Sequence, residues 1–97
     1  MPTYVALLNF TDQGIRTVRD TLDRADMAAQ LAQQYGARIE QFYWTLGSYD
    51  IVLIIEAPDD ETMSAFALKI GSLGSVKSHT MRAFRRNEME KILAKIK

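Results

Sequence analysis

The sequence predicts an α+β domain with strands and helices in the order βαββαβ, followed by a C-terminal helix. Four short runs rich in β-branched and aromatic residues indicate the strands. Three stretches with apolar residues at steps of three and four indicate the helices. With 97 residues, of which 47% are apolar and 25% charged, we expect one globular domain over residues 1–97.

The first third of the chain is expected to form a strand and then a broken helical region. Residues 3–10 are β-branched and aromatic-rich, and Thr11 and Asp12 after them are residues that cap helices. Residues 15–35 carry an apolar stripe at helical spacing that stops at Gly36. A second capping position near Asp20 divides this region, so we expect a short helix, a break and a longer helix.

A hairpin is expected in the middle of the chain. Residues 37–45 end in three successive aromatics and form the second strand, and residues 50–56 form an almost wholly apolar third strand. The connection between them contains Gly47, which suits a tight turn.

The last third repeats the pattern and adds a helix. Pro58 and three carboxylates mark a helix start, and Gly71 and Gly74 mark its end. Residues 76–84 form the fourth strand, and Asn87 is expected to cap the final helix.

This order is the ferredoxin-like split βαβ pattern, in which helices cover one face of a mostly antiparallel four-stranded sheet. Residues 51–55 are apolar on both sides of their strand, which is typical of a strand buried on both faces. The uncovered face therefore needs a partner, and a second copy of the sheet predicts a homodimer or higher homo-oligomer. Alternatively, the C-terminal helix folds over that face within one chain.

Composition and charge exclude several classes of protein. The chain has no cysteine, which excludes disulfides and thiolate metal sites and fits the cytoplasm. Residues 75–97 hold seven basic and two acidic residues, but no basic stripe interleaved with aromatics follows a strand, so we expect no nucleic-acid partner. The N-terminus shows no basic leader and no apolar span of about 18 residues follows, so we expect neither export nor a membrane.

Several segments resemble the bacterial GYD domain family, named for a Gly, Tyr and Asp signature. In this chain the signature residues are Gly47, Tyr49 and Asp50, within residues 43–60, and the resemblance extends to residues 4–14, 71–74 and 80–84. The resemblance implies a ferredoxin-like fold of the dimeric α+β-barrel type. It implies little about function, because the family is largely uncharacterised.

The signature residues have two interpretations. Turn chemistry alone explains them, with Gly47 at positive φ, Asp50 accepting N–H bonds and Tyr49 packing on the sheet end. Alternatively, Asp50 is a general base or ligand-binding carboxylate beside the Tyr49 hydroxyl.

Aromatic and basic side chains on the strands are further candidates for binding a ligand. Tyr43 and Trp44 point to opposite faces of their strand, so one of them enters the core or an interface. Arg82 has a guanidinium that suits an anion, with an ion pair to Asp50 or Glu56 as the structural alternative.

His79 is the only histidine and is a candidate acid, base or haem ligand, although a surface position is the simpler interpretation. A lone histidine lacks partner ligands for zinc, so we expect no metal, and no cofactor motif is present.

Three functions remain open on the sequence. The first is a cytoplasmic homo-oligomer that binds a small organic molecule between sheet and helices or inside the barrel. The second is a cofactor-independent oxygenase or isomerase that uses Asp50, Tyr49, His79 or Arg82. The third is a structural or interaction module without a ligand.

Overall fold

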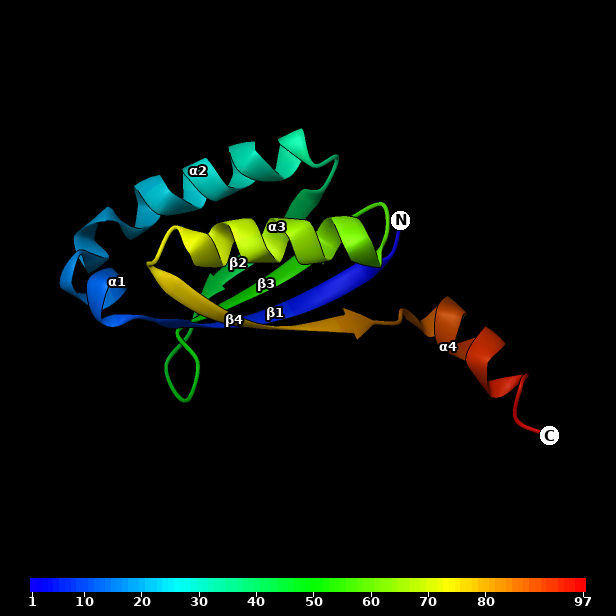
Figure 1. Cartoon of the computed structure of the whole chain (residues 1–97). Coiled ribbons are helices and arrows are strands. Elements are labelled where there is room, and N and C mark those ends of the chain that lie inside the picture. The colour runs from blue at the N-terminus through cyan, green and yellow to red at the C-terminus, as the bar shows by residue number, and fades with distance from the viewer.

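The computed structural model describes residues 1–97 and has the predicted element order (Figure 1). The elements are β1 (Thr3–Phe10), α1 (Asp12–Arg16), a 3-10 turn η1 (Val18–Asp20), α2 (Thr21–Gln34), β2 (Arg38–Trp44), β3 (Ile51–Glu56), α3 (Asp60–Ser72), β4 (Val76–Ala83) and α4 (Arg86–Leu93). The strands form one sheet in the order β2-β3-β1-β4, and all three neighbouring pairs are antiparallel. The predicted ferredoxin-like α+β fold is confirmed.

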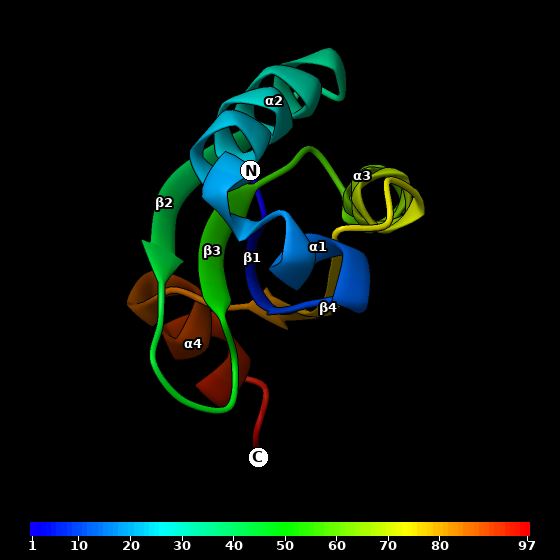
Figure 2. The same ribbon diagram turned by 90° about the vertical axis from the view of Figure 1, so that its left-hand side faces the viewer.

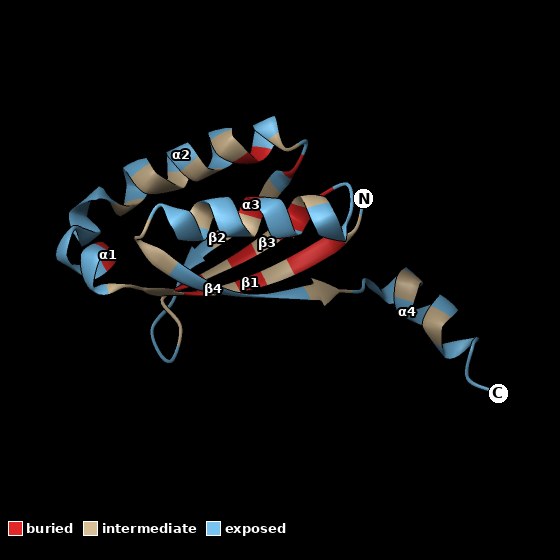
Figure 3. Ribbon diagram, viewed as in Figure 1, coloured by how far each residue is buried: buried red, intermediate tan, exposed pale blue.

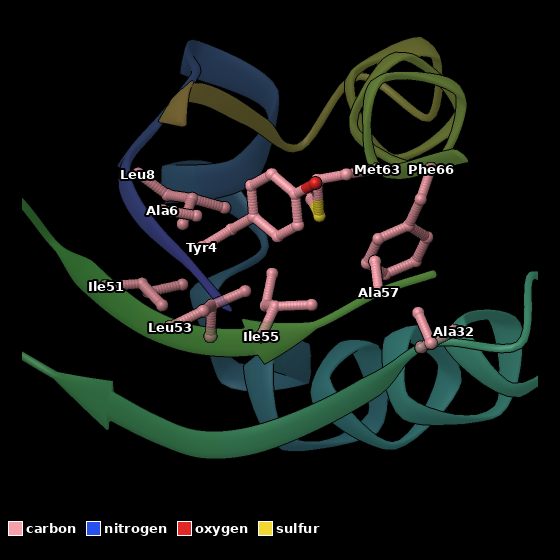
Figure 4. Close-up of a cluster of buried hydrophobic side chains, with 11 residues drawn as sticks. Tyr4, Ala6, Leu8, Ala32, Ile51, Leu53, Ile55, Ala57, Met63 and Phe66 are labelled. Atoms are coloured by element: carbon pink, nitrogen blue, oxygen red, sulfur yellow. The ribbon is translucent and has the colours of Figure 1, made fainter. Parts of the chain in front are cut away.

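Helices α2 and α3 lie on the same face of the sheet (Figure 2). The core forms beneath them, because alternate residues of a strand point to the same side. Side chains of β1 and β3 meet Met63 and Phe66 of α3 there, as Figure 4 shows. The strand residues of this core are Tyr4, Ala6, Leu8, Ile51, Leu53 and Ile55.

Three of the four predicted helix starts are confirmed, since Asp20 is the N-cap residue of α2. Thr11 caps α1 and Asp59 caps α3 through side-chain oxygens that accept backbone N–H bonds. The prediction that Asn87 caps the last helix is wrong. That helix begins two residues earlier, with Arg85 at the cap, because the Arg85 backbone N–H donates to the Glu88 carboxylate at 3.0 Å.

A close backbone approach joins α1 to the start of β4. The Thr11 N–H donates to the Ser75 carbonyl at 3.0 Å, and the Thr11 hydroxyl donates to the Gly74 carbonyl at 2.5 Å. Gly14 lies against the same connection, where a Cβ atom would collide with the Ser75 backbone oxygen. A glycine is therefore required at position 14 by packing.

The second face of the sheet has no helix over it. We call this surface the open sheet face, and its apolar members are Val5, Leu7, Val52, Ile54 and Met81. The helix side of β3 is buried as predicted, at Ile51, Leu53 and Ile55, whereas Val52 and Ile54 on the open side are only partly buried in a single chain.

Helix α4 does not cover the open sheet face. It continues past the end of β4, away from the sheet (Figure 1), and none of its residues is buried (Figure 3). The intramolecular alternative for covering this face is therefore not what the structure adopts. Two apolar surfaces, the open sheet face and one side of α4, are left without a partner in a single chain.

Candidate functional site

An apolar cleft lies between α2, α3 and the helix-covered face of the sheet, and we call it the α2–α3 cleft. Its volume is about 260 Å³, and 13 of its 16 lining residues are hydrophobic. Leu8, Phe10, Ile51 and Leu53 form the floor from the sheet. Such a concave, mostly apolar space with a few polar groups is typical of small-molecule sites.

Helices α2 and α3 supply most of the walls of the cleft, through side chains at helical spacing. From α2 the cleft has Thr21, Arg24, Ala25, Met27, Ala28 and Leu31, and from α3 it has Phe66 and Ile70. Small alanines on α2 leave the space that larger side chains would fill. The local sequence therefore creates the cleft, by placing alanine where a core helix ordinarily carries leucine or isoleucine.

Arg24 is the only charged residue of the α2–α3 cleft. Its Nη1 donates to the Thr17 carbonyl at 2.8 Å and to the Thr17 hydroxyl at 3.0 Å, and its Nη2 donates to the Gly14 carbonyl at 3.2 Å. All three acceptors are neutral, and none of the salt bridges of the chain includes Arg24. The cleft thus has one uncompensated cation beside an apolar body.

A second, smaller hollow of about 220 Å³ lies between α3 and the end of β4. The Tyr4 hydroxyl donates to Asp60 there at 2.5 Å, and Arg82 Nε lies 4.0 Å from the same carboxylate. Burial of Tyr4, with the hydrogen bond to Asp60, raises the pKa of Tyr4 to about 12. A phenol with this pKa is a hydrogen-bond donor at neutral pH and a poor general base.

The signature residues lie at the β2–β3 connection. Gly47 has φ of +139°, a conformation that favours glycine. Asp50 is half-buried, and its Oδ2 accepts the Phe10 N–H at 2.9 Å, which ties the hairpin to the end of β1. The Tyr49 carbonyl accepts the Thr45 hydroxyl at 2.6 Å. One oxygen of the Asp50 carboxylate thus binds a backbone donor at the end of the sheet.

The aromatic side chains of β2 divide between the faces as their alternation predicts. Phe42 and Trp44 share the helix-covered side, with ring centroids 4.6 Å apart, and Phe42 lines the α2–α3 cleft. The Trp44 indole N–H donates to the Thr21 hydroxyl at 3.0 Å. Tyr43 is on the other side, where its hydroxyl donates to Gln41 at 2.9 Å.

His79 and Arg82 lie on opposite faces of β4. His79 is exposed on the side of the open sheet face, and Tyr49 lies edge-on to its ring with centroids 5.8 Å apart. Arg82 is on the helix-covered side. The expected ion pair of Arg82 with Asp50 or Glu56 is wrong, since Arg82 pairs with Glu88 at 3.3 Å and Asp60 at 4.0 Å. The physical reasons are register and face: Arg82 lies opposite Tyr4, at the end of the sheet near α3 and α4, whereas Glu56 lies opposite Thr3 and so on the other face.

The sequence candidates therefore do not converge on one centre. The structure brings Tyr49 to His79, and Trp44 to the edge of the cleft, but separates these pairs from Arg82. Thr21 and Arg24 were missed by the sequence reasoning. The available signal was a cation at a position that shares one face of the helix with Ala25 and Ala28.

Comparison with known proteins agrees with the fold and the signature. The family model of the GYD domain matches residues 4–93. This chain belongs to the GYD domain family. The family assignment covers nearly the whole sequence, and the predicted resemblance is confirmed.

This chain is also similar to a Thermus thermophilus protein called "Glutamine synthetase and cystathionine beta-lyase binding protein". The two are 36% identical over 84 residues, which is 86% of this chain and 88% of the relative.

Three crystal structures share the fold. MtbAldR has a TM-score of 0.67 at 13% identity, over 88% of this chain, and this GYD chain spans about half of MtbAldR, 54%. FFRP-DM1 has a TM-score of 0.60 at 21% identity, over 87% of this chain and 100% of its own. TTHA0845 from Thermus thermophilus has a TM-score of 0.57 at 22% identity, over 88% and 95%. At these identities the likeness shows the fold alone.

Two further features describe this GYD chain. None of its helices is both long and apolar enough to span a membrane. No group of three or more histidine, aspartate or glutamate side chains is placed to hold a metal ion.

Proposed function

We propose that this GYD chain is a cytoplasmic homodimeric binding protein that takes a small organic molecule in the α2–α3 cleft. The observation that supports ligand binding is the cleft itself, which has a volume of about 260 Å³ and is lined almost wholly by apolar side chains. The proposed dimer joins two copies through the open sheet face.

The surface area of the single chain supports the dimer. An 11.0 kDa chain has an accessible surface of 6635 Å². A compact monomer of this mass has about 5,600 Å². The radius of gyration, 14.5 Å, also exceeds the value of about 12.5 Å for a compact domain of this length. An isolated copy therefore exposes about 1,000 Å² more than an ordinary monomer does.

A second copy suits the open sheet face better than a partner of one charge sign. The apolar centre of the face is flanked by a mixed network in which Arg38 pairs with Glu56 and Arg85 pairs with Glu40 at 2.8 Å. A two-fold contact brings the same surface against itself, so a single-sign rim would repel its copy. A rim with both signs, on a chain of net charge zero, avoids this repulsion.

Native mass spectrometry of the protein purified from cells tests the function. We expect a mass of two chains and a retained molecule of defined extra mass. Ala28→Phe should lose that molecule, because Ala28 lines the cleft and the larger ring fills it. Ala29→Phe is the matched control, since Ala29 is exposed on the same helix and does not line the cleft. A retained mass that survives in Ala28→Phe, or its absence from the wild-type protein, contradicts binding in the cleft.

The placement of the candidate catalytic residues gives less support to an enzyme. Its candidate residues lie on opposite faces of the sheet, and Asp50 is engaged by the Phe10 N–H. A general base must reach a substrate proton within hydrogen-bond distance, and Asp50 does not line the α2–α3 cleft.

Binding of a partner protein is a second candidate, favoured by the name of the Thermus thermophilus relative. The chain offers an apolar side of α4, where Met89 and Leu93 are 44% and 53% exposed. We propose that α4 contacts a glutamine synthetase or a cystathionine β-lyase from the same organism.

Biolayer interferometry with the two purified enzymes tests this second candidate. Leu93→Ser should weaken binding at least tenfold, whereas Leu68→Ser, which removes an exposed leucine of α3, should not. Absence of wild-type binding to both enzymes, or equal effects of the two substitutions, contradicts it.

A further inference from the structure

We infer that the ligand of the α2–α3 cleft is a small amphipathic carboxylate, with its apolar body in the cleft and its carboxylate on Arg24 and Thr21. The inference rests on the proposed function, since it names the chemical class of the ligand in the same cleft. Arg24 and Thr21 are the residues that would bind the ligand, and the ligand is expected to be an anion.

The charge of the ligand follows from the environment of Arg24. Arg24 is a partly buried residue, and the partners of its guanidinium are two backbone carbonyls and one hydroxyl, although the chain contains 12 acidic residues. A partly desolvated cation gains most from an anion, because charge-assisted hydrogen bonds are about twice as strong as neutral ones. An anionic ligand supplies the compensating charge that the chain does not.

The donors that remain on Arg24 suit a carboxylate. A guanidinium has five N–H donors, and three of them are used, two on Nη1 and one on Nη2. The Nε donor and the second Nη2 donor are left. Two donors on neighbouring nitrogens match the two oxygens of one carboxylate in a bidentate pair. The bonds to Gly14 and Thr17 hold the plane of the guanidinium, so the remaining donors have a defined direction.

Thr21 supplies a further donor at the same end of the cleft. It lies three residues before Arg24 on α2, and residues at this spacing are neighbours on one helix face. Its oxygen accepts the Trp44 indole N–H, so its own hydroxyl proton is available to a ligand oxygen. Trp44 thus acts as a positioning residue, through Thr21.

The rest of the cleft suits an apolar body. Apart from Thr21, Arg24 and Ser75, every lining residue is hydrophobic. The volume of about 260 Å³ is below the roughly 300–1,000 Å³ of sites for drug-sized ligands, so the body is short. A longer chain or a large ring system would exceed this space.

Isothermal titration calorimetry with three eight-carbon probes tests the inference: octanoate, 1-octanol and octylamine. We expect octanoate to bind the wild-type protein about 10- to 100-fold more tightly than 1-octanol, with octylamine weakest. Arg24→Gln should remove the preference for octanoate, and Arg24→Lys should keep part of it because the charge remains. Circular dichroism establishes that each variant is folded, since Arg24 also holds α1.

The cleft variants separate the ligand class from the proposed function. Loss of octanoate binding in Ala28→Phe, with binding retained in Ala29→Phe, supports the placement. Equal binding of octanoate and 1-octanol, both abolished by Ala28→Phe, overturns the carboxylate inference and leaves the proposed function standing. Octanoate binding unchanged by Ala28→Phe or by Arg24→Gln also overturns the inference. If no probe binds, the inference is wrong, and the retained mass seen from cells still decides the proposed function.

Discussion

Replacing Ile54 by lysine is expected to separate the proposed dimer without unfolding the chain. Ile54 lies in β3 near the centre of the open sheet face, and it is partly buried in a single copy. Its opposite neighbours on β2 and β1 are Gln41 and Val5. A charge at this position can stay hydrated in the monomer but is desolvated when a second sheet covers it.

The expected size of the effect follows from burial. Full burial of an isoleucine side chain contributes about 1.5–3 kcal/mol, and at most about a third of that remains to be gained on dimerisation because Ile54 is already partly buried in a single copy. Desolvation of the ammonium group adds at least about 1–3 kcal/mol. Two-fold symmetry counts both terms twice, which gives about 3–8 kcal/mol per dimer. The dimer Kd should rise by about 10²-fold or more.

Sedimentation equilibrium at micromolar concentration measures this change. The wild-type protein should sediment as a dimer, and Ile54→Lys as an 11.0 kDa monomer with an unchanged circular dichroism spectrum. Leu68→Lys is the matched control, because it makes the same kind of substitution at a 74% exposed position of α3, on the helix side. A monomeric wild type, or an Ile54→Lys protein that dimerises like the wild type, would refute the reasoning from the open sheet face.

Three further predictions concern single chains. Gly14→Ala should lower the free energy of unfolding by about 1–3 kcal/mol or more, because the methyl group meets the Ser75 carbonyl. Gly71→Ala should raise it by about 0.5–1 kcal/mol, because a methyl group meets nothing at this helical position. Thermal unfolding that ranks the two variants in the opposite order contradicts the packing of α1. Asp50→Ala should cost about 1–3 kcal/mol by leaving the Phe10 N–H without its acceptor, and Asp50→Asn clearly less, since an amide oxygen still accepts; equal losses in urea unfolding would contradict a tethering role. One phenol should ionise near pH 12 in an absorbance titration and disappear in Tyr4→Phe. Because the folded pKa of Tyr4 lies above its ordinary value of 10.0, its contribution to stability is complete below pH 10 and is lost as the pH rises towards 12; a wild type and a Tyr4→Phe protein with the same pH dependence of stability in that window contradict it.

Local sequence rules predicted the strands and most helix boundaries well. The first strand, residues 3–10, has the predicted bounds, and the break near Asp20 separates α1 from α2 as expected. These features depend on residues close in the chain, such as a capping side chain three residues from its partner. The cap of α4 was predicted at Asn87 because asparagine is a preferred N-cap residue. In the structure the Arg85 backbone N–H donates to the Glu88 carboxylate, which places the cap at Arg85.

The sites were less predictable, because they depend on which elements become neighbours. Alternation along β4 separated His79 from Arg82 correctly, but only the β1–β4 register brings Arg82 to Asp60 and Glu88. Arg24 was not among the predicted site residues, since an arginine on a helix ordinarily extends into solvent. Its role appears only when α2 lies over the sheet and α1 supplies carbonyl acceptors.

The sequence by itself determined the element order, the GYD family and the apolar character of both sides of β3. Periodicity and turn chemistry are local properties, and a period of two residues assigns each strand residue to one side or the other. Tertiary structure alone decided that α4 leaves the open sheet face bare, that Asp50 is tied to Phe10, and that Arg24 stands beside an apolar cleft. The physical reason is that hydrogen bonds, desolvation and cavities depend on distances between residues far apart in the chain, and a one-dimensional pattern does not contain those distances.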